Sequence, residues 1–256
     1  MIRELIAVFL LSWLPAVAFG ATFSVIGDDD FPPFSFIDQD NQLKGIDVEM
    51  TQEMARRLGI NVDIILVPWK RLLLMTEKGD VFGSFGLFKT PEREAFALYT
   101  APVHRSTYKL FTTKNTLTEF EDISDLYGKR LGIEAGFAIS TEFDAAKIKG
   151  DIDVIEFFNF EDIFRRILGG GIDAFVGNEL VIKHKIAGRY SKIKNISDIT
   201  FLPKPVKESR SAYFVLSKKF PLKDKHIWQA KIIKILKQME EDGFTDKIIQ
   251  KYTSEL

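Results

Sequence analysis

Short apolar runs alternate with amphipathic segments along most of this chain. Runs typical of buried strands occupy residues 22–27, 62–67, 81–88, 108–114, 129–134, 153–157, 172–178 and 211–219. Segments with apolar residues at helical spacing lie between or after them, at residues 45–59, 69–80, 136–150, 161–171, 179–190 and 223–243. In the first of these, Ile46, Met50, Met54 and Leu58 share one face. Alternating strands and helices predict an α/β fold in which mostly parallel sheets are flanked by helices.

Two stretches of the chain repeat the same order of elements. Residues 72–85 read LLLMTEKGDVFGSF and residues 163–177 read IFRRILGGGIDAFVG, each an apolar helix, glycine, an acid and an apolar strand. We therefore expect two lobes of like design. Open α/β sheets bind ligands at the carboxyl ends of their strands. The loops at 28–34, 85–93 and 134–138, together with Asn178, are thus expected to face one cleft.

The N-terminal twenty residues have the layout of a secretory signal peptide. A positive charge precedes an apolar run at residues 5–14, and small residues follow at 16–20. A membrane anchor is the alternative, but the run is short for a bilayer and Pro15 interrupts it. We expect residues 1–20 to be removed by cleavage after Ala18 or Gly20. Because the chain has no cysteine, it has no lipoprotein tether, and we expect a freely soluble periplasmic protein.

Composition and motifs exclude several classes of protein. The chain has 35 basic and 36 acidic residues and no long basic block, so we expect no nucleic-acid partner. The three histidines lie far apart in the sequence, so no zinc-site spacing is present. No Walker A, GxGxxG or GxSxG pattern occurs. We therefore expect no cofactor and no metal.

Four motifs, in order along the chain, resemble those of one known family. They are DDFPPFSFIDQDNQLKGIDVEM at 29–50, KGDVFGSFGLFKTPER at 78–93, ISDLYGKRLGIEAG at 123–136 and LGGGIDAFVGN at 168–178. From about Phe23 to Tyr252 the chain resembles the family 3 periplasmic solute-binding proteins, the amino-acid-type receptors of ABC importers. One residue is inserted between Asp80 and Arg93 relative to the family pattern.

The resemblance implies a two-lobed flytrap fold and a transport function. Lobe one would comprise residues 22–111 and 213–256, and lobe two residues 112–212, with hinges near 111–113 and 211–213. Such lobes close on a ligand by hinge motion. The implied function is to capture a small carboxylate-bearing solute, an amino acid or a related compound, and deliver it to the membrane permease of an ABC importer. We expect the receptor to be a monomer.

The resemblance also assigns roles at the cleft. Arg93 matches the arginine that holds the α-carboxylate of the ligand, and a guanidinium fork suits a planar carboxylate. The alternative is a structural charge in the turn that follows Thr90 and Pro91. Phe31 matches the aromatic residue that stacks on the ligand side chain. The other candidate ligand-binding residues are Asp30, Trp69, Gly86, Phe88, Glu134, Phe137, Ala138 and Asn178.

The sequence departs from the family pattern at several of these positions. Asn178 stands where an aspartate usually pairs with the ligand ammonium, and its carbonyl can only accept a hydrogen bond. Phe137 and Phe88 replace small hydroxyl residues, which makes the pocket more apolar. Glu134 could supply the missing charge or lie at the surface, and several phenylalanines could belong to the core. Backbone N–H groups at an expected helix start near Ala138 could meet an anion.

Two rival functions remain open at this point. Some periplasmic dehydratases that act on cyclohexadienyl acids share this fold. For such an enzyme, Glu134 or Asp30 would serve as a general acid, but no residue pair demands this chemistry, and we expect a binding protein. A sensor module that works with a separate output domain is the other alternative.

Overall fold

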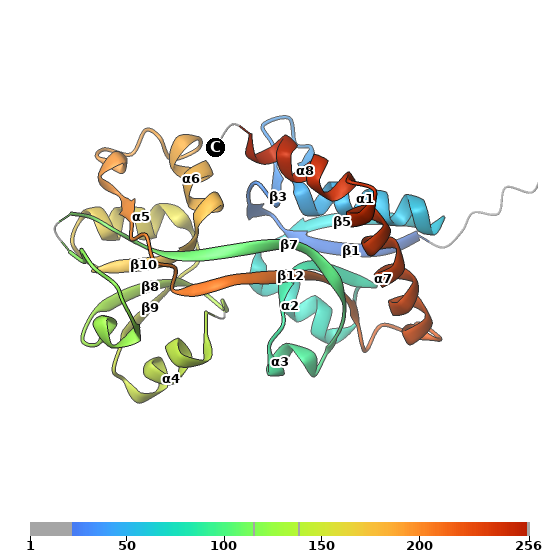
Figure 1. The fold of residues 1–256 in the computed structure, drawn as a ribbon, viewed down its shortest axis with the longest axis horizontal. Helices are drawn as coiled ribbons and strands as arrows, with labels where there is room; N and C mark the ends of the chain where they lie inside the picture. Colours follow the sequence, from blue (N-terminus) through green and yellow to red (C-terminus); the bar gives the residue numbers. More distant parts are fainter. Residues whose placement is uncertain (1–21, 115, 138, 255–256) are drawn as a thin grey trace, which may run out of the picture.

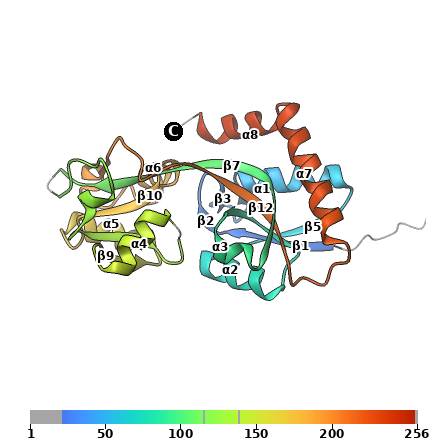
Figure 2. The ribbon, with the colours of Figure 1, turned by 60° about the horizontal axis from the view of Figure 1, so that its bottom comes forward.

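Two long strands connect two groups of elements. The computed structural model describes residues 22–114, 116–137 and 139–254. Strands β7 (Ala97–Thr112) and β12 (Lys207–Ser217) run antiparallel to each other between the two groups (Figure 1). Figure 2 shows the same two groups side by side, again joined by these strands. We call the group that contains β1 lobe one and the group that contains β8 lobe two.

Lobe one holds the N-terminal elements and the C-terminal helices. Its members are β1 (Thr22–Asp28), α1 (Ile46–Leu58), β5 (Asn61–Val67), α2 (Trp69–Lys78), β6 (Gly83–Phe88), α3 (Pro91–Glu94), α7 (Lys225–Glu241) and α8 (Phe244–Thr253). A small antiparallel sheet of β2 (Asp30–Phe31), β3 (Ser35–Ile37) and β4 (Leu43–Lys44) lies beside it. Strand β1 pairs in parallel with both β5 and β6.

Lobe two is built in the same way. It contains the short helix η1 (Ile123–Leu126), β8 (Arg130–Glu134), α4 (Thr141–Lys149), β9 (Asp153–Phe157), α5 (Phe160–Leu168), β10 (Ala174–Asn178), α6 (Glu179–Ala187), η2 (Ile196–Asp198) and β11 (Thr200–Phe201). Strand β8 pairs in parallel with β9 and β10. The nine strands β5-β1-β6-β12-β7-β10-β8-β9, with β11 beside β7, form one continuous sheet through both lobes. The expected α/β fold is confirmed, and antiparallel pairing is concentrated at the crossing strands and in the small sheet.

Local sequence explains why the helices begin and end where they do. The Asn159 side chain caps α5 by accepting a hydrogen bond from the Asp162 N–H at 2.9 Å. Along this helix the buried residues are Phe160, Ile163, Phe164 and Ile167, which is the spacing of one helical face. Most of the largest fully buried side chains are phenylalanines. As expected, many of the 23 phenylalanines therefore form the core.

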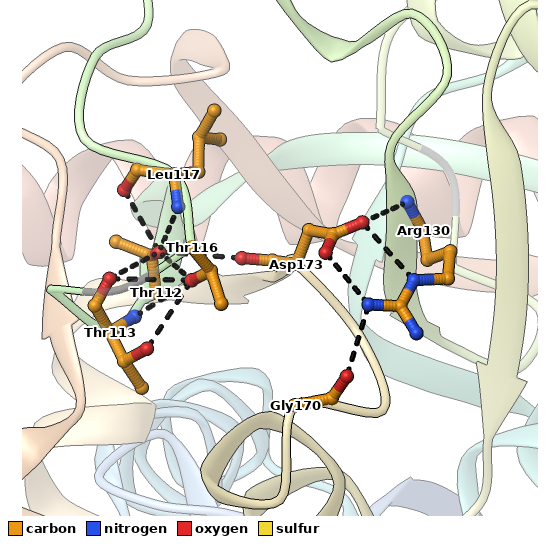
Figure 3. Close-up of polar contacts among 7 residues, drawn as sticks. All are labelled: Thr112, Thr113, Thr116, Leu117, Arg130, Gly170 and Asp173. Carbon is orange, nitrogen blue, oxygen red and sulfur yellow. Dashed lines mark hydrogen bonds and ion pairs between the residues drawn. The ribbon is translucent and has the colours of Figure 1, made fainter.

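Polar contacts anchor the end of β7 in lobe two (Figure 3). The buried Thr112 hydroxyl accepts a hydrogen bond from the Leu117 N–H at 3.2 Å and lies 3.3 Å from the Asp173 carbonyl. The Asp173 carboxylate in turn accepts hydrogen bonds from the backbone and guanidinium of Arg130 at 2.8 and 2.9 Å. The crossing strand is thus held to the turn that precedes β10.

Three expected elements begin several residues from their expected start, and one of them is β12, which starts at Lys207 rather than at residue 211. Strand β7 starts at Ala97 rather than at residue 108, because it continues through lobe one beside β12. Helix α4 starts at Thr141 rather than at residue 136, because the Ser140 hydroxyl caps it by accepting from the Phe143 N–H at 3.1 Å. The expected lobe boundaries fall in or next to β7 and β12, and they stay a prediction. Within the described part of the chain, no helix combines the length and apolar character that a membrane crossing requires. The signal peptide expected at residues 1–20 lies outside the described residues.

Candidate functional site

Arg93 lies on α3, the short helix that follows β6. The Thr90 hydroxyl caps this helix by accepting a hydrogen bond from the Arg93 N–H at 3.3 Å. Pro91 occupies the first turn, where a missing N–H leaves no intrahelical bond unmade. The Thr-Pro pair therefore ends the strand and starts the helix that carries Arg93. Only 5% of Arg93 is exposed, so it is not a solvated surface charge.

The Arg93 guanidinium contacts both lobes. Its Nη1 donates to the Phe88 carbonyl and its Nη2 donates to the Gly136 carbonyl, each at 3.2 Å. Its central carbon lies 5.1 Å from the centre of the Trp69 ring. Phe88 and Trp69 belong to lobe one, whereas Gly136 follows β8 in lobe two.

Among the described residues, no carboxylate forms an ion pair with Arg93. Burial lowers the pKa of Arg93 from its ordinary value, and the Arg210 charge nearby acts in the same direction. Buried charges in proteins are ordinarily paired with an opposite charge. Arg93 is instead held by carbonyl dipoles and an aromatic face, and it is suited to bind an anion.

Phe137 lies in the middle of a cage of aromatic rings. Its ring centre is 5.5 Å from those of Trp69 and Tyr108, 6.1 Å from that of Phe31 and 6.2 Å from that of Phe88. These separations fall in the range of favourable aromatic pairs. The structure thus brings together four of the candidate residues, Phe31, Trp69, Phe88 and Phe137.

A cavity of about 10 Å³ remains beside this ring, and its lining includes Phe31, Tyr108, Glu134 and Asn178. The Tyr108 hydroxyl and the Asn178 amide nitrogen are buried and have no hydrogen-bond partner among the described residues. The Asn178 side-chain oxygen accepts from the Val181 N–H at 3.1 Å and caps α6. The Asn178 carbonyl oxygen thus caps a helix, and its amide nitrogen lies beside the cavity without a partner among the described residues. Its contact with a ligand stays a prediction.

Acidic groups gather at another part of the interface between the lobes. Asp28 ends β1, Glu134 ends β8, and Asp30 in β2 forms an ion pair with Lys185 of α6. The Lys185 side chain is 2% exposed. Carboxylates thus outnumber the lysine that neutralises them. The described residues nevertheless include no group of three or more His, Cys, Asp or Glu side chains arranged to hold a metal ion.

The pKa values of these groups reflect their burial. Burial raises the pKa of Asp28 to about 7. Burial raises the pKa of Glu134 well above its usual range, and the Asp28 charge adds to this shift. Burial lowers the pKa of Lys185, while the Asp30 carboxylate opposes the change. Glu134 thus lies close enough to Asp28 and Lys185 for their charges to affect its pKa.

Sequence reasoning missed two of the residues placed here. Lys185 lies on the buried face of α6 with Val181 and Ile182, and helical spacing from the Asn178 cap could have indicated this position. Tyr108 lies near the middle of the cleft on β7, but one ring in a long strand gave no such signal.

A further candidate, Gly86, lies apart from the cage. Gly86 is in β6 with a φ of +81°, and a Cβ there would lie 3.3 Å from the Asp47 carboxylate. Ala138 lies outside the described residues. The helix start expected near it is wrong, because α4 begins at Thr141. The anion contact expected from that helix start is therefore lost at this position.

Asp47, His104 and Ser106 form a buried polar chain. His104 Nδ1 lies 2.6 Å from Asp47 Oδ1, and His104 Nε2 lies 3.1 Å from Ser106 Oγ. This order resembles a hydrolytic triad, but the three residues are 1%, 4% and 2% exposed. A solute cannot reach them without rearrangement, so we interpret the chain as a structural link between α1 and β7.

Comparisons with known proteins agree with this geometry. The histidine-binding periplasmic protein of Escherichia coli is 22% identical over 227 residues, which cover 88% of this chain and 85% of that protein. An ancestral arginine-binding protein bound to arginine has the same fold, with a TM-score of 0.76 and 22% identity over 92% of this chain and 99% of that one. A histidine kinase sensor domain with similarity to periplasmic binding proteins gives a TM-score of 0.78 and 20% identity over 92% of this chain and 97% of that one.

A family model gives the decisive match. The model of the bacterial extracellular solute-binding proteins, family 3, matches residues 23–255, nearly the whole chain. The position of Arg93, the two lobes and the crossing strands are consistent with this match. The chain belongs to family 3 of the bacterial extracellular solute-binding proteins.

Proposed function

We propose that this protein captures a small carboxylate-bearing solute, an amino acid or a related compound, in the periplasm. It then delivers the solute to the membrane permease of an ABC importer. The observation that carries the proposal is Arg93, a 5% exposed cation that donates to two carbonyls and forms no ion pair with a described carboxylate. A solute carboxylate would supply the missing charge and accept from two guanidinium nitrogens at once.

The acidic cluster supports an amino group on the same solute. Asp28, Asp30 and Glu134 surround one buried ammonium, that of Lys185. Asn178 brings no charge, so Glu134 takes the place of the usual aspartate in this proposal. A zwitterion would place its carboxylate at Arg93 and its cation beside Glu134. The names of the relatives, which bind histidine or arginine, agree with such a solute.

The crossing strands support capture by closure. Within the part of the chain that the structure describes, β7, β12 and their neighbouring turns are the covalent connections between the lobes (Figure 1). Rotation about residues 111–113 and 211–213 would separate Arg93 from Gly136 and open the cage to solvent. Residues 22–111 with 213–256 and residues 112–212 are the two bodies that we propose to move.

A thermal-shift screen tests the binding proposal. Amino acids, polyamines, keto acids and small peptides are offered to the wild-type protein, because a ligand that binds only the folded state raises its melting temperature. We expect shifts from carboxylates and none from polyamines, which carry no carboxylate. Arg93→Ala should lose the shift. A shift of equal size in Arg93→Ala would remove the proposed role of this residue.

A sensor module is the second candidate function, favoured by the likeness to a histidine kinase sensor domain. Uptake of the labelled solute by host cells that lack this protein separates the two. Loss of uptake supports the importer. Unchanged uptake with an altered transcriptional response to the solute supports the sensor. Mass spectrometry of the bound solute after incubation tests for enzymatic turnover, and we expect an unchanged mass.

A further inference from the structure

The loop that follows β8 enters the place where a solute would bind. Gly136 has a φ of +81°, a left-handed conformation that glycine adopts without strain. This turn aims its carbonyl at lobe one, where the oxygen accepts from Arg93 Nη2 at 3.2 Å and from Trp69 Nε1 at 3.4 Å. The next residue, Phe137, places its ring in the aromatic cage.

The cage that receives Phe137 belongs to the other side of the cleft. Phe31, Trp69 and Phe88 lie on lobe one, and Tyr108 lies on the crossing strand β7. Phe137 is the ring of the cage that comes from lobe two, so its contacts exist only while the lobes are closed. One backbone oxygen and one ring of the loop thus satisfy Arg93 and fill the cage together.

The space left over is too small for a solute. The cavity of about 10 Å³ beside Phe137 is near the lower limit for a single water molecule. A solute that places a ring in this cage and a carboxylate on Arg93 must therefore displace the loop and take over its contacts. The loop shows which groups fit this place: an oxygen that accepts a hydrogen bond from the Arg93 guanidinium, and a flat apolar ring that fills the cage.

We propose that residues 134–137 act as an internal surrogate ligand, and that the solute is an aromatic carboxylate. Its carboxylate replaces the Gly136 carbonyl on Arg93, and its ring replaces that of Phe137. This inference rests on the proposed function and names its solute class. A carboxylate outcompetes the neutral carbonyl because it supplies the charge that Arg93 lacks.

Covalent geometry sets the spacing between the two groups. In the loop, the amide nitrogen, Cα and Cβ of Phe137 separate the Gly136 carbonyl carbon from the ring. Phenylbutyrate has a chain of the same number of atoms between carboxylate and ring, phenylpropionate has one fewer, and benzoate has none. Phenylbutyrate and phenylpropionate, the latter with the spacing of an aromatic amino acid, should therefore bind better than benzoate.

Calorimetric titration of Phe137→Ala with this series tests the proposal. Deleting the ring removes the internal competitor and leaves an apolar space that a ring-sized solute can fill. We expect phenylbutyrate to bind Phe137→Ala at least about tenfold more tightly than it binds the wild type, a difference of about 1.4 kcal/mol. Butyrate, which lacks the ring, and phenylbutylamine, which lacks the carboxylate, should not show this gain.

Matched variants keep each outcome interpretable. Tyr127→Ala removes a lobe-two ring that is 49% exposed and outside the cage, and it should bind phenylbutyrate as the wild type does. Arg93→Ala combined with Phe137→Ala should lose the gain. If Phe137→Ala does not fold, Phe137→Leu keeps apolar volume without the ring, and a smaller gain is expected.

The outcomes separate this inference from the proposed function. Equal affinity of wild type and Phe137→Ala for phenylbutyrate would overturn the surrogate-ligand role. A gain for butyrate as large as that for phenylbutyrate would overturn the aromatic class. In both cases Arg93→Ala could still abolish binding of another carboxylate, and the proposed function would stand. If Arg93→Ala leaves every carboxylate bound as before, the proposed function fails as well.

Discussion

Two buried cations lie at the interface between the lobes, and their surroundings are opposite. Lys185 is 2% exposed and pairs with Asp30, with Glu134 and Asp28 near enough to affect its pKa. Arg93 is 5% exposed, and its described partners are two carbonyls and the Trp69 ring. One cation has a carboxylate partner and two further carboxyl groups near it, and the other has no carboxylate of the described residues in contact.

In the proposed function, this difference makes Lys185 a latch and Arg93 a binding group. Lys185 comes from lobe two and Asp30 from lobe one, so their ion pair joins the lobes. Arg93 also bridges the lobes, but through a neutral carbonyl that a carboxylate can replace. The Lys185 end of the interface is therefore a completed contact, and the Arg93 end is provisional.

The largest expected effect is a loss of affinity for the solute carboxylate when Arg93 is truncated. Truncation in Arg93→Ala leaves a desolvated solute carboxylate without a partner, at a cost of about 2–5 kcal/mol. At about 1.4 kcal/mol per factor of ten, this cost lowers the affinity for the solute by a factor of between roughly 30 and several thousand. Arg93→Lys keeps the positive charge but loses the two-pronged guanidinium, so its affinity for the solute should lie between those of the wild type and Arg93→Ala. Competition with a labelled carboxylate measures all three proteins.

Lys185→Met provides the contrast to this prediction. Because Lys185 already has a carboxylate partner in the protein, Lys185→Met should weaken carboxylate binding far less than Arg93→Ala does. Equal losses of affinity in both variants would show that the two cations do the same work.

The next effect is a pH dependence at the acidic end. Burial raises the pKa of Asp28 from its ordinary value of 3.8 to about 7. The folded protein therefore keeps a proton that the unfolded chain releases, so this contribution to stability is full below about pH 4 and is lost as the pH rises to about 7. At about 1.36 kcal/mol per pKa unit, the loss is up to about 4 kcal/mol.

Melting curves between about pH 4 and pH 8 measure this loss. Asp28→Asn should flatten the profile, and part of the dependence should persist because the pKa of Glu134 is raised as well. The same pH profile in wild type and Asp28→Asn would show that Asp28 is not buried as a protonated group.

A smaller effect is expected from breaking the latch. Removing one partner of a buried ion pair costs about 3–5 kcal/mol. Since the Asp30 side chain is 39% exposed, we expect about 1–3 kcal/mol from Lys185→Met. The ion pair that joins the lobes is then lost, and small-angle scattering should show a larger radius of gyration without solute.

Lys183→Met is the matched control for the latch. Lys183 lies on the same helix, but its side chain is 39% exposed and pairs with Glu179 at the surface, so the expected loss is about 0–1 kcal/mol. A radius of gyration in Lys185→Met equal to that of the wild type and of this control would argue against a latch.

The smallest effect lies away from the cleft. Thr112→Val removes the hydroxyl that accepts from the Leu117 N–H at the anchor of β7 (Figure 3). Leaving that buried donor unpaired should lower the free energy of unfolding by about 1–2 kcal/mol. Affinity for carboxylates should not change. A clear loss of affinity would mean that the anchor controls the closing of the lobes.

Local sequence signals predicted the frame of the site. Thr90 and Pro91 fix the start of α3 through a cap and a proline first turn, and they place Arg93 where the motif indicated. The apolar pattern predicted a helix at residues 161–171, and the structure has α5 at Phe160–Leu168. These features depend on residues within a few positions of one another, which is why the sequence alone could show them.

The contacts between the lobes could not be predicted in this way. Phe137 meets Phe31 and Trp69, which are distant in sequence, and the meeting depends on how the lobes close. The sequence indicated only that the pocket is apolar. The buried pairing of Lys185 depends on the same closure. By contrast, the missed start of α4 had a local signal, because Ser140 is a favourable cap.

The most direct test of the central claim is a cycle that changes the solute and the protein together. The tightest carboxylate from the screen and its primary amide are titrated by calorimetry against wild type and Arg93→Ala. We predict that the wild type prefers the acid by roughly 30-fold or more, a coupling of about 2 kcal/mol or more, and that Arg93→Ala shows no such preference. An acid preference that survives unchanged in Arg93→Ala would contradict the claim that Arg93 binds the carboxylate of the solute.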